Sequence, residues 1–266
     1  MKKSLFKRSI LFVLTPFFLL SCSGNSDADE SLPFSTISVD CGKTFNISGD
    51  KEMNIENDYV ASFSNGLVKG LHIGNTSAVY NNSQRIEITV NPTVKYTYYP
   101  SDKWNASMSE VEQYINSQKV NVDHNKNSNG IIDIVAEGGK GSNIKFIYYH
   151  SFKNGKLTGS TILTPVPQME TYVKWISEKY LMIPTNSSEK NFSATGCDAY
   201  DLDKANTSLL VLVQTLNTNS NAQYTLSTNY WIQTVLLPFS STKSIENFDI
   251  PEDVKLSLSK LGYEIE

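Results

Sequence analysis

Short runs of alternating apolar and polar residues fill the chain from residue 34 to residue 92. The run Arg85–Val90 alternates strictly, which is typical of a strand with one buried face. Asn65-Gly66 lies between two such runs and predicts a tight hairpin turn, because both residues tolerate positive φ. We therefore predict a β-sandwich over residues 34–92. Its expected strands are Thr36–Val39, Thr44–Ile47, Val60–Ser64, Leu67–Leu71, Thr76–Tyr80 and Arg85–Val90.

From residue 93 to residue 266, strand-like runs are mixed with three helical patterns. Ser107 and Glu110 have the spacing of a capping box, which predicts that a helix begins there. Two further helices are expected at Gln168–Lys179 and Ile250–Leu261. This pattern predicts an α+β domain in a chain that is mainly β. Its expected strands are Val94–Tyr99, Lys119–Val122, Ile131–Glu137, Ile144–Phe152, Leu157–Pro165, Tyr180–Ile183, Ser208–Leu216 and Asn229–Phe239.

The first two of these helices superpose at an offset of 61 residues, so that Tyr114 falls on Trp175 and Ile115 on Ile176. This order suggests two β-α-β-β-β halves, which are either an old duplication or a chance similarity of pattern. The stretch Asn186–Thr207 interrupts the second half and is predicted to be a long loop.

The start of the chain reads as an export signal. Four positive residues precede the apolar run Ile10–Leu20, which is shorter than the roughly 20 residues that span a bilayer. The run ends in Leu19-Leu20-Ser21-Cys22 and resembles the lipobox of bacterial lipoproteins. The resemblance implies that residues 1–21 are removed and that Cys22 carries lipid on its sulfur and an acylated amino terminus. Stable anchoring needs more than one acyl chain. The alternative is an ordinary signal peptide followed by a chance cysteine.

Residues 22–33 then form an acidic, polar tether. The tether is either a plain spacer or similar to the acidic signal that sends some Gram-negative lipoproteins to the outer face of the outer membrane. Ser23, where an aspartate would favour retention in the inner membrane, agrees with the outer membrane. We expect a lipid-anchored protein at the cell surface, with the periplasmic face as the alternative.

The sandwich region also carries a family motif. Its features are Asn57, Val60-Ala61, Asn65-Gly66-Leu67-Val68, Gly70, Gly74 and Thr76, followed by Ile88-Thr89-Val90. With this spacing the region resembles a group 2 bacterial immunoglobulin-like domain, although Met53–Glu56 stand where that family usually has a tryptophan. The resemblance implies an Ig-like β-sandwich without activity of its own, used as a spacer, adhesin repeat or carbohydrate-associated module.

Charge and cysteine content limit the partners. Removal of the signal peptide takes four of the 23 Lys and Arg residues and none of the 27 Asp and Glu, which leaves a net charge of −8. An acidic chain disfavours nucleic acid as a partner. Cys41 and Cys197 then remain. They either pair as a disulfide or stay as two free thiols, and their spacing does not suggest zinc.

Motifs for catalysis or metal binding are weak. The sequence has no H-E-x-x-H, G-x-S-x-G, P-loop or dinucleotide-binding glycine pattern. Asn125–Asp133 has the spacing of a calcium loop, but amides replace its carboxylates and Ala136 stands at the twelfth position, so an Asn-Gly hairpin explains it more simply. We predict no catalytic residue, no metal and no cofactor. A cell-envelope hydrolase using acidic residues such as Asp198, Asp201 and Asp203 is the less favoured alternative.

Aromatic residues in and beside the strands of the second domain are the candidate binding residues. Rings beside amide and acidic side chains commonly hold sugars, and Tyr99, Trp104 and Tyr149 are the first candidates for exposure. We therefore expect a non-catalytic protein whose α+β domain captures a glycan, a peptide or an envelope protein. The alternative is a structural or assembly role through protein contacts alone. A concave aromatic surface would favour capture, and a flat apolar face would favour assembly.

Overall fold

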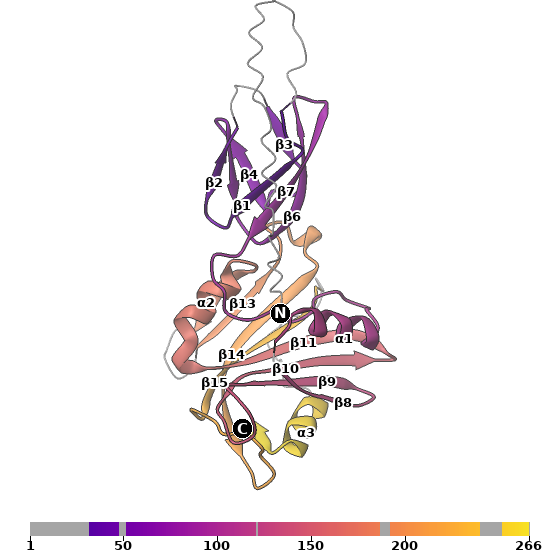
Figure 1. Ribbon diagram of the computed structural model, residues 1–266, viewed down its shortest axis with the longest axis vertical. Helices are drawn as coiled ribbons and strands as arrows, with labels where there is room; N and C mark the ends of the chain where they lie inside the picture. The colour runs from indigo at the N-terminus through magenta and orange to yellow at the C-terminus, as the bar shows by residue number, and fades with distance from the viewer. Residues whose placement is uncertain (1–31, 48–51, 121, 187–191, 240–251, 266) are drawn as a thin grey trace, which may run out of the picture. The chain divides into compact units, whose positions relative to one another are not determined.

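The computed structural model describes residues 32–47, 52–120, 122–186, 192–239 and 252–265. Strands dominate these residues, as the sequence predicts (Figure 1). Two small sheets form a β-sandwich in the first region, and one large sheet with three α-helices forms the second. The signal peptide, Cys22 and the tether up to Ser31 lie outside the described residues, so their predicted roles stay predictions.

The sandwich has seven strands: β1 (Thr36–Asp40), β2 (Thr44–Asn46), β3 (Met53–Ile55), β4 (Ala61–Ser64), β5 (Leu67–Gly70), β6 (Gly74–Tyr80) and β7 (Gln84–Asn91). One sheet has the order β1-β7-β6-β3 and the other β2-β5-β4. The alternation in β7 places Ile86, Ile88 and Val90 in the core, each no more than 2% exposed. Asn65 and Gly66 have φ values of 50° and 73°, which confirms the predicted hairpin turn between β4 and β5. Strand β3 was not predicted from the sequence.

The second region begins with α1 (Met108–Ser117) and continues through four strands: β8 (Val122–Lys126), β9 (Gly130–Ala136), β10 (Ile144–Lys153) and β11 (Lys156–Pro165). A 3-10 turn η1 (Val166–Gln168) leads into α2 (Met169–Ser177), β12 (Leu181–Asn186) and β13 (Ser193–Cys197). The last elements are η2 (Leu202–Lys204), β14 (Thr207–Thr218), β15 (Tyr230–Pro238), α3 (Glu252–Lys260) and β16 (Tyr263–Ile265).

These strands form one sheet in the order β12-β13-β14-β15-β11-β10-β9-β8, with β16 added beside β14. Each half is a helix followed by four antiparallel strands, and the final strands β11 and β15 pair with each other at the centre. The predicted β-α-β-β-β order was therefore wrong. Leu157–Pro165 closes the first half instead of opening the second, because the tight turn at Asn154 and Gly155 folds β11 back onto β10.

Two further predictions need correction. Residues 94–99 pair with no strand among the described residues, so the expected strand Val94–Tyr99 is absent. The predicted long loop Asn186–Thr207 contains β13, which pairs with β12 on one side and β14 on the other. The residues of this strand are small, so it has no clear hydrophobic pattern in the sequence. At Gly196 a larger residue does not fit. A Cβ atom there would lie 1.9 Å from the carbonyl oxygen of Leu181 on the neighbouring strand.

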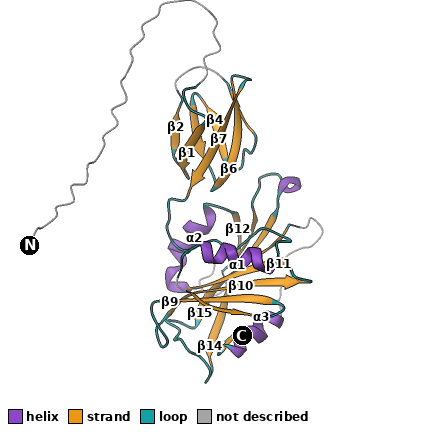
Figure 2. Cartoon of the chain, turned by 45° about the vertical axis from the view of Figure 1, so that its right-hand side comes forward, coloured by secondary structure: helices purple, strands orange, loops and turns teal. Residues whose placement is uncertain are grey.

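Both faces of the large sheet are covered, α1 and α2 on one side and α3 on the other (Figures 1 and 2). Trp175 and Ile176 of α2 pack on Tyr148 and Ile162 of one face. Leu258 of α3 packs against the opposite face, where Tyr149, Leu163 and Trp231 lie. Coverage on both faces explains why the central strands read as nearly continuous apolar runs.

Candidate functional site

A hollow of about 400 Å³ follows the unpaired segment between β7 and α1. Residues of that segment form most of its wall, and one turn of α1 and one residue of α2 complete it. We call this hollow the aromatic groove. Its lining residues are Pro92, Val94, Lys95, Tyr96, Thr97, Tyr98, Tyr99, Tyr114, Gln118 and Trp175.

The segment is held at its two ends. The buried carboxylate of Glu178 accepts a hydrogen bond from the Thr93 backbone N–H at 2.9 Å and is also bonded to the Thr93 hydroxyl. At the other end, the hydroxyl of Tyr148 donates to the carbonyl of Tyr98 at 3.1 Å, and that of Tyr114 donates to the carbonyl of Tyr99 at 2.5 Å. The chain between these anchors therefore has a fixed path across the groove.

Two aromatic stacks fix the rings of the segment. The Tyr99 ring lies parallel to Trp175 at 4.2 Å, and the Tyr98 ring lies parallel to Tyr148 at 4.1 Å. The Tyr96 ring meets Phe146 edge-on at 5.0 Å. Such contacts add about 0.5–1.5 kcal/mol each beyond the area that they bury. The groove is thus preformed.

The hydroxyl groups of Tyr96, Tyr99 and Tyr114, three of the groove's tyrosines, donate to internal acceptors. Tyr99 donates to the carbonyl of Trp175 at 2.7 Å, and Tyr96 donates to the side-chain oxygen of Gln168 at 2.7 Å. Burial raises the pKa of Tyr96, Tyr99 and Tyr114 well above the ordinary value of 10, because a phenolate would lose its hydration there. These hydroxyls stay protonated and stay engaged.

The contribution of α1 follows from helix geometry. Tyr114 and Gln118 are four residues apart and therefore lie on one side of α1. The start of α1 is set by the predicted capping box, in which Ser107 accepts from the Glu110 N–H while Glu110 accepts from the Ser107 N–H. This confirms the predicted start of the helix.

The three predicted binding residues are not brought together. Tyr99 lines the groove and is half-buried. Trp104 is half-buried elsewhere, where its ring nitrogen donates to the carbonyl of Asn206 at 2.9 Å. The expected exposure of Tyr149 was wrong, since this residue is 1% exposed. Alternation along β10 turns Tyr149 to the face beneath α3, while Tyr148 faces α1 and α2.

Sequence reasoning missed Gln118 and Lys95 and did not place Tyr114 and Trp175 in a site. The offset of 61 residues, which aligns Tyr114 with Trp175, was the available signal. The offset marked Tyr114 and Trp175 as packing residues of their helices. The groove lies where these two residues, one from α1 and one from α2, approach the same unpaired segment.

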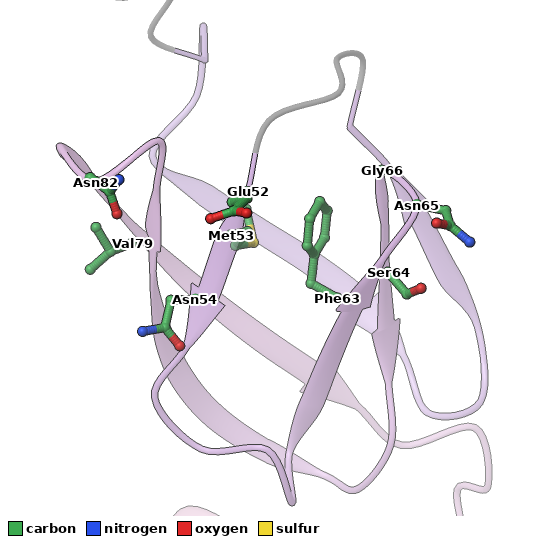
Figure 3. A pocket seen from close by; sticks show the side chains of 9 residues that line it. All are labelled: Glu52, Met53, Asn54, Phe63, Ser64, Asn65, Gly66, Val79 and Asn82. Atoms are coloured by element: carbon green, nitrogen blue, oxygen red, sulfur yellow. The ribbon is translucent and has the colours of Figure 1, made fainter.

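A larger hollow of about 570 Å³ lies in the sandwich, between β3 and β4 (Figure 3). Phe63 stands in this space beside Met53, and Asn65 points away from it (Figure 3). The polar rim comes largely from turns, because Asn65 and Asn82 both have positive φ, which asparagine tolerates. Glu52 also follows directly on a stretch that the structure does not describe. Turn geometry explains this rim, so we place the candidate site at the aromatic groove.

A network of titratable side chains connects α1 to the edge of the sheet. His124 of β8 contacts buried Asp133 at 2.6 Å through Nδ1 and Glu112 of α1 at 3.2 Å through Nε2. Lys126 also donates to Glu112 at 2.8 Å. Burial raises the pKa of Asp133, and the His124 contact opposes that shift. Both ring nitrogens of His124 thus face carboxylates, which ties α1, β8 and β9 together.

The other candidate ligands serve local turns. Asn127 accepts from the N–H groups of Asn129 and Gly130 at 2.8 and 3.0 Å, which confirms the predicted β8–β9 hairpin. Asp198 accepts from the backbone N–H groups of Asn206 and Thr207 at 2.8 and 2.9 Å. Within the described residues, no three His, Cys, Asp or Glu side chains are placed to hold a metal ion.

Cys41 and Cys197 are free thiols in the described structure. The Cys41 thiol donates to the carbonyl of Leu71 at 3.0 Å, and the Cys197 thiol donates to that of Ala199 at 3.1 Å. Of the two alternatives left by the sequence, the structure has the unpaired one. Among the described residues, no helix has the length and apolar character needed to cross a membrane.

Comparison with known proteins gives no relative to set beside this geometry. No family model, no curated protein and no solved structure matches the chain.

Proposed function

We propose that this protein is a non-catalytic, lipid-anchored binding protein of the bacterial outer membrane. In this proposal, Cys22 carries the lipid and residues 22–33 form the tether. The sandwich over residues 34–92 serves as an Ig-like stalk, and the domain over residues 93–266 captures a glycan, a peptide or an envelope protein. The membrane contact is made through the lipid on Cys22.

The observation that carries the binding role is the aromatic groove. It is a concave site whose rings are fixed by stacking on the sheet and on α2, as with Tyr99 on Trp175. Pre-organised concave sites lined by aromatic side chains are the usual form of small-ligand and peptide sites. A flat apolar face would have favoured the assembly role instead.

Filling the groove tests this function. Gln118 is half-buried at the groove end of α1, so Gln118→Trp adds bulk there without touching the sheet. The mature chain in detergent is heated with panels of oligosaccharides and of short peptides. A ligand at about 100 times its Kd adds about 2.7 kcal/mol and raises the melting temperature by several degrees.

The wild type should respond to one panel and Gln118→Trp to neither, while both proteins melt alike without ligand. A wild type that responds to nothing, or a filled variant that responds equally, contradicts the groove as the binding site.

Separate experiments test the proposed lipid anchor and location. Labelled fatty acid should enter the wild type and the control Cys41→Ala, and it should be absent from Cys22→Ala. Equal labelling of all three would contradict the lipobox. Protease added to intact cells should degrade the protein if it lies at the surface, and full protection would place it on the periplasmic face.

A further inference from the structure

The unpaired segment of the groove has an open backbone edge. Residues 94–99 run without a turn, a bend or a strand partner. Within the described part of the chain, the N–H groups of residues 95–99 donate to no acceptor, and the C=O groups of residues 94–97 accept no hydrogen bond. Buried backbone polar groups are nearly always paired, so these groups face water or a ligand. An unpaired extended segment can pair with an extended peptide through the same backbone hydrogen bonds that join a peptide to the edge strand of a sheet.

The side chains of the groove present aromatic rings to a ligand and few free hydrogen-bonding groups. The hydroxyls of Tyr96, Tyr99 and Tyr114 are already bonded to internal acceptors. Gln118 donates to the carbonyl of Tyr114 and to the Ser117 hydroxyl. A glycan, whose recognition needs many side-chain donors and acceptors, finds few of them here. The polar groups that remain are mostly those of the backbone.

One side chain has an unmet hydrogen bond. Tyr98 lines the groove, is 5% exposed, and its hydroxyl has no partner in the described part of the chain. A buried hydroxyl without a partner is uncommon in folded proteins and calls for an explanation such as a bound ligand or water. This oxygen is itself enclosed by protein, so it does not contact a ligand in the groove.

The charge of the groove selects among peptides. Lys95 is the one charged residue among the lining residues, it is exposed, and it forms no ion pair within the described residues. Lys119, next to lining Gln118, is exposed and equally without an ion pair there. The mature chain as a whole carries a net charge of −8, so this lysine-bearing site is unlike most of its surface. Charge complementarity therefore favours a carboxylate-bearing ligand.

We propose that the aromatic groove binds an extended acidic peptide that pairs with residues 95–97 as an added strand. Its apolar or aromatic side chains lie against the rings of Tyr96, Tyr99 and Tyr114, and a carboxylate lies at Lys95. This inference rests on the proposed binding function and names its ligand class as a polypeptide segment. Backbone pairing supplies affinity, and the rings and Lys95 supply selectivity.

The experiment starts from a library of random peptides displayed on phage. Peptides are selected on the wild-type mature chain after removal of those that bind Gln118→Trp. The selected sequences should combine β-branched or aromatic residues in alternation with Asp or Glu. Selection of basic sequences, or of sequences without alternation, would overturn the proposal.

Backbone pairing is then tested on one selected peptide by N-methylation at alternate residues. An added strand directs every second N–H toward residues 95–97, and each lost hydrogen bond should weaken binding about tenfold. Methylation of the intervening residues should leave affinity unchanged. Equal effects of the two methylation patterns would overturn strand pairing.

The charge contact is tested with Lys95→Glu, matched by Lys140→Glu in the exposed turn after β9. Lys95→Glu should weaken the acidic peptide about fivefold at low salt, and Lys140→Glu should leave it unchanged. Equal weakening by both variants would overturn the carboxylate contact.

The outcomes separate this inference from the function on which it rests. Oligosaccharides that bind the wild type but not Gln118→Trp, with no peptide binding, overturn the inference and keep the function. Binding of neither peptides nor oligosaccharides overturns both.

Discussion

The two halves of the large sheet share one topology but differ in the contacts that their helices make at matching positions. Glu112 of α1 and Val173 of α2 occupy matching positions at the offset of 61 residues. Glu112 is bound by Lys126 and His124 at the sheet edge. Val173 instead packs against the apolar core beneath α2. Both helices bury apolar side chains, as with Val111 and Ile115 of α1, but at this position the first helix has a charged contact where the second has an apolar one.

The strands below repeat this contrast. One cross-strand row runs through both halves and contains His124, Asp133, Tyr148, Ile162, Thr234, Val211, Ala194 and Pro184. Counted outward from the central β11–β15 pair, Asp133 and Ala194 both take the third position in this row. In the row two residues further along the strands, His150 and Leu209 also take equivalent positions. At these two positions the second half has an apolar residue where the first half has a titratable one, whereas at the centre of the row Thr234 of the second half faces apolar Ile162 of the first. The same topology accepts different side chains at equivalent positions because the backbone pairing is unchanged.

The groove takes residues from both helices. Tyr114 and Gln118 come from α1, which has the charged contact, and Trp175 comes from α2, which has the apolar one. Substitutions that exchange features of the two halves test this difference.

The largest expected effect comes from the matched pair Trp175 and Tyr114. Trp175 is 1% exposed, so Trp175→Ala should lower the free energy of unfolding by about 3–5 kcal/mol through cavity formation. Tyr114 is half-buried, and Tyr114→Ala should cost about half as much. Urea unfolding followed by circular dichroism measures both. Equal losses would contradict the view that the second helix forms the core.

A smaller effect is expected from His150→Leu, which copies Leu209 into the first half. Burial lowers the pKa of His150 to about 3. The unfolded chain binds a proton near pH 6.5 that the folded chain does not, so stability falls as the pH drops below that value. Between about pH 7 and pH 5 the wild type should lose about 2 kcal/mol relative to His150→Leu.

The control is Leu209→Val, which adds no titratable group and should change the free energy of unfolding equally at both pH values. If the wild type and His150→Leu keep the same stability difference across this range, His150 is not held neutral by the fold.

The smallest effect on the free energy of unfolding should come from loss of the contacts between Glu112 of α1 and the sheet edge. Glu112→Gln removes the ion pair to Lys126 and the carboxylate that faces His124, and should cost less than about 1 kcal/mol at low salt. The cost should largely disappear in about 1 M salt, because screening removes the attraction in the wild type. Val173→Ala should show a cost that salt does not reduce. Urea titrations at two salt concentrations decide, and a salt-independent cost of Glu112→Gln would refute the contrast.

Local signals in the sequence were enough to predict much of the fold. The alternation in β7, the Asn65-Gly66 turn and the Ser107–Glu110 capping box each act within a few residues, and all three are confirmed. Pairing between distant strands was not readable in this way. The small residues of β13 become a strand only because β12 and β14 lie on either side.

The site was harder to predict for the same reason. Alternation identified Tyr99 and Tyr149 as aromatic candidates but not which face of the sheet each would occupy. Coverage by α3 buries Tyr149, and the lack of a partner strand leaves Tyr99 beside the groove. Segment 94–99 has the composition of a strand and no partner within the described chain, which is the feature that the proposed ligand would complete.

Hydrogen exchange of the backbone amides in residues 95–99 tests this central claim most directly. The mature chain is compared alone and with a selected acidic peptide at saturation. Alternate amides among residues 95–99 should exchange at least tenfold more slowly in the complex, because an added strand accepts from every second one. Peptide binding that leaves all five of these amides unprotected would contradict strand addition at the aromatic groove.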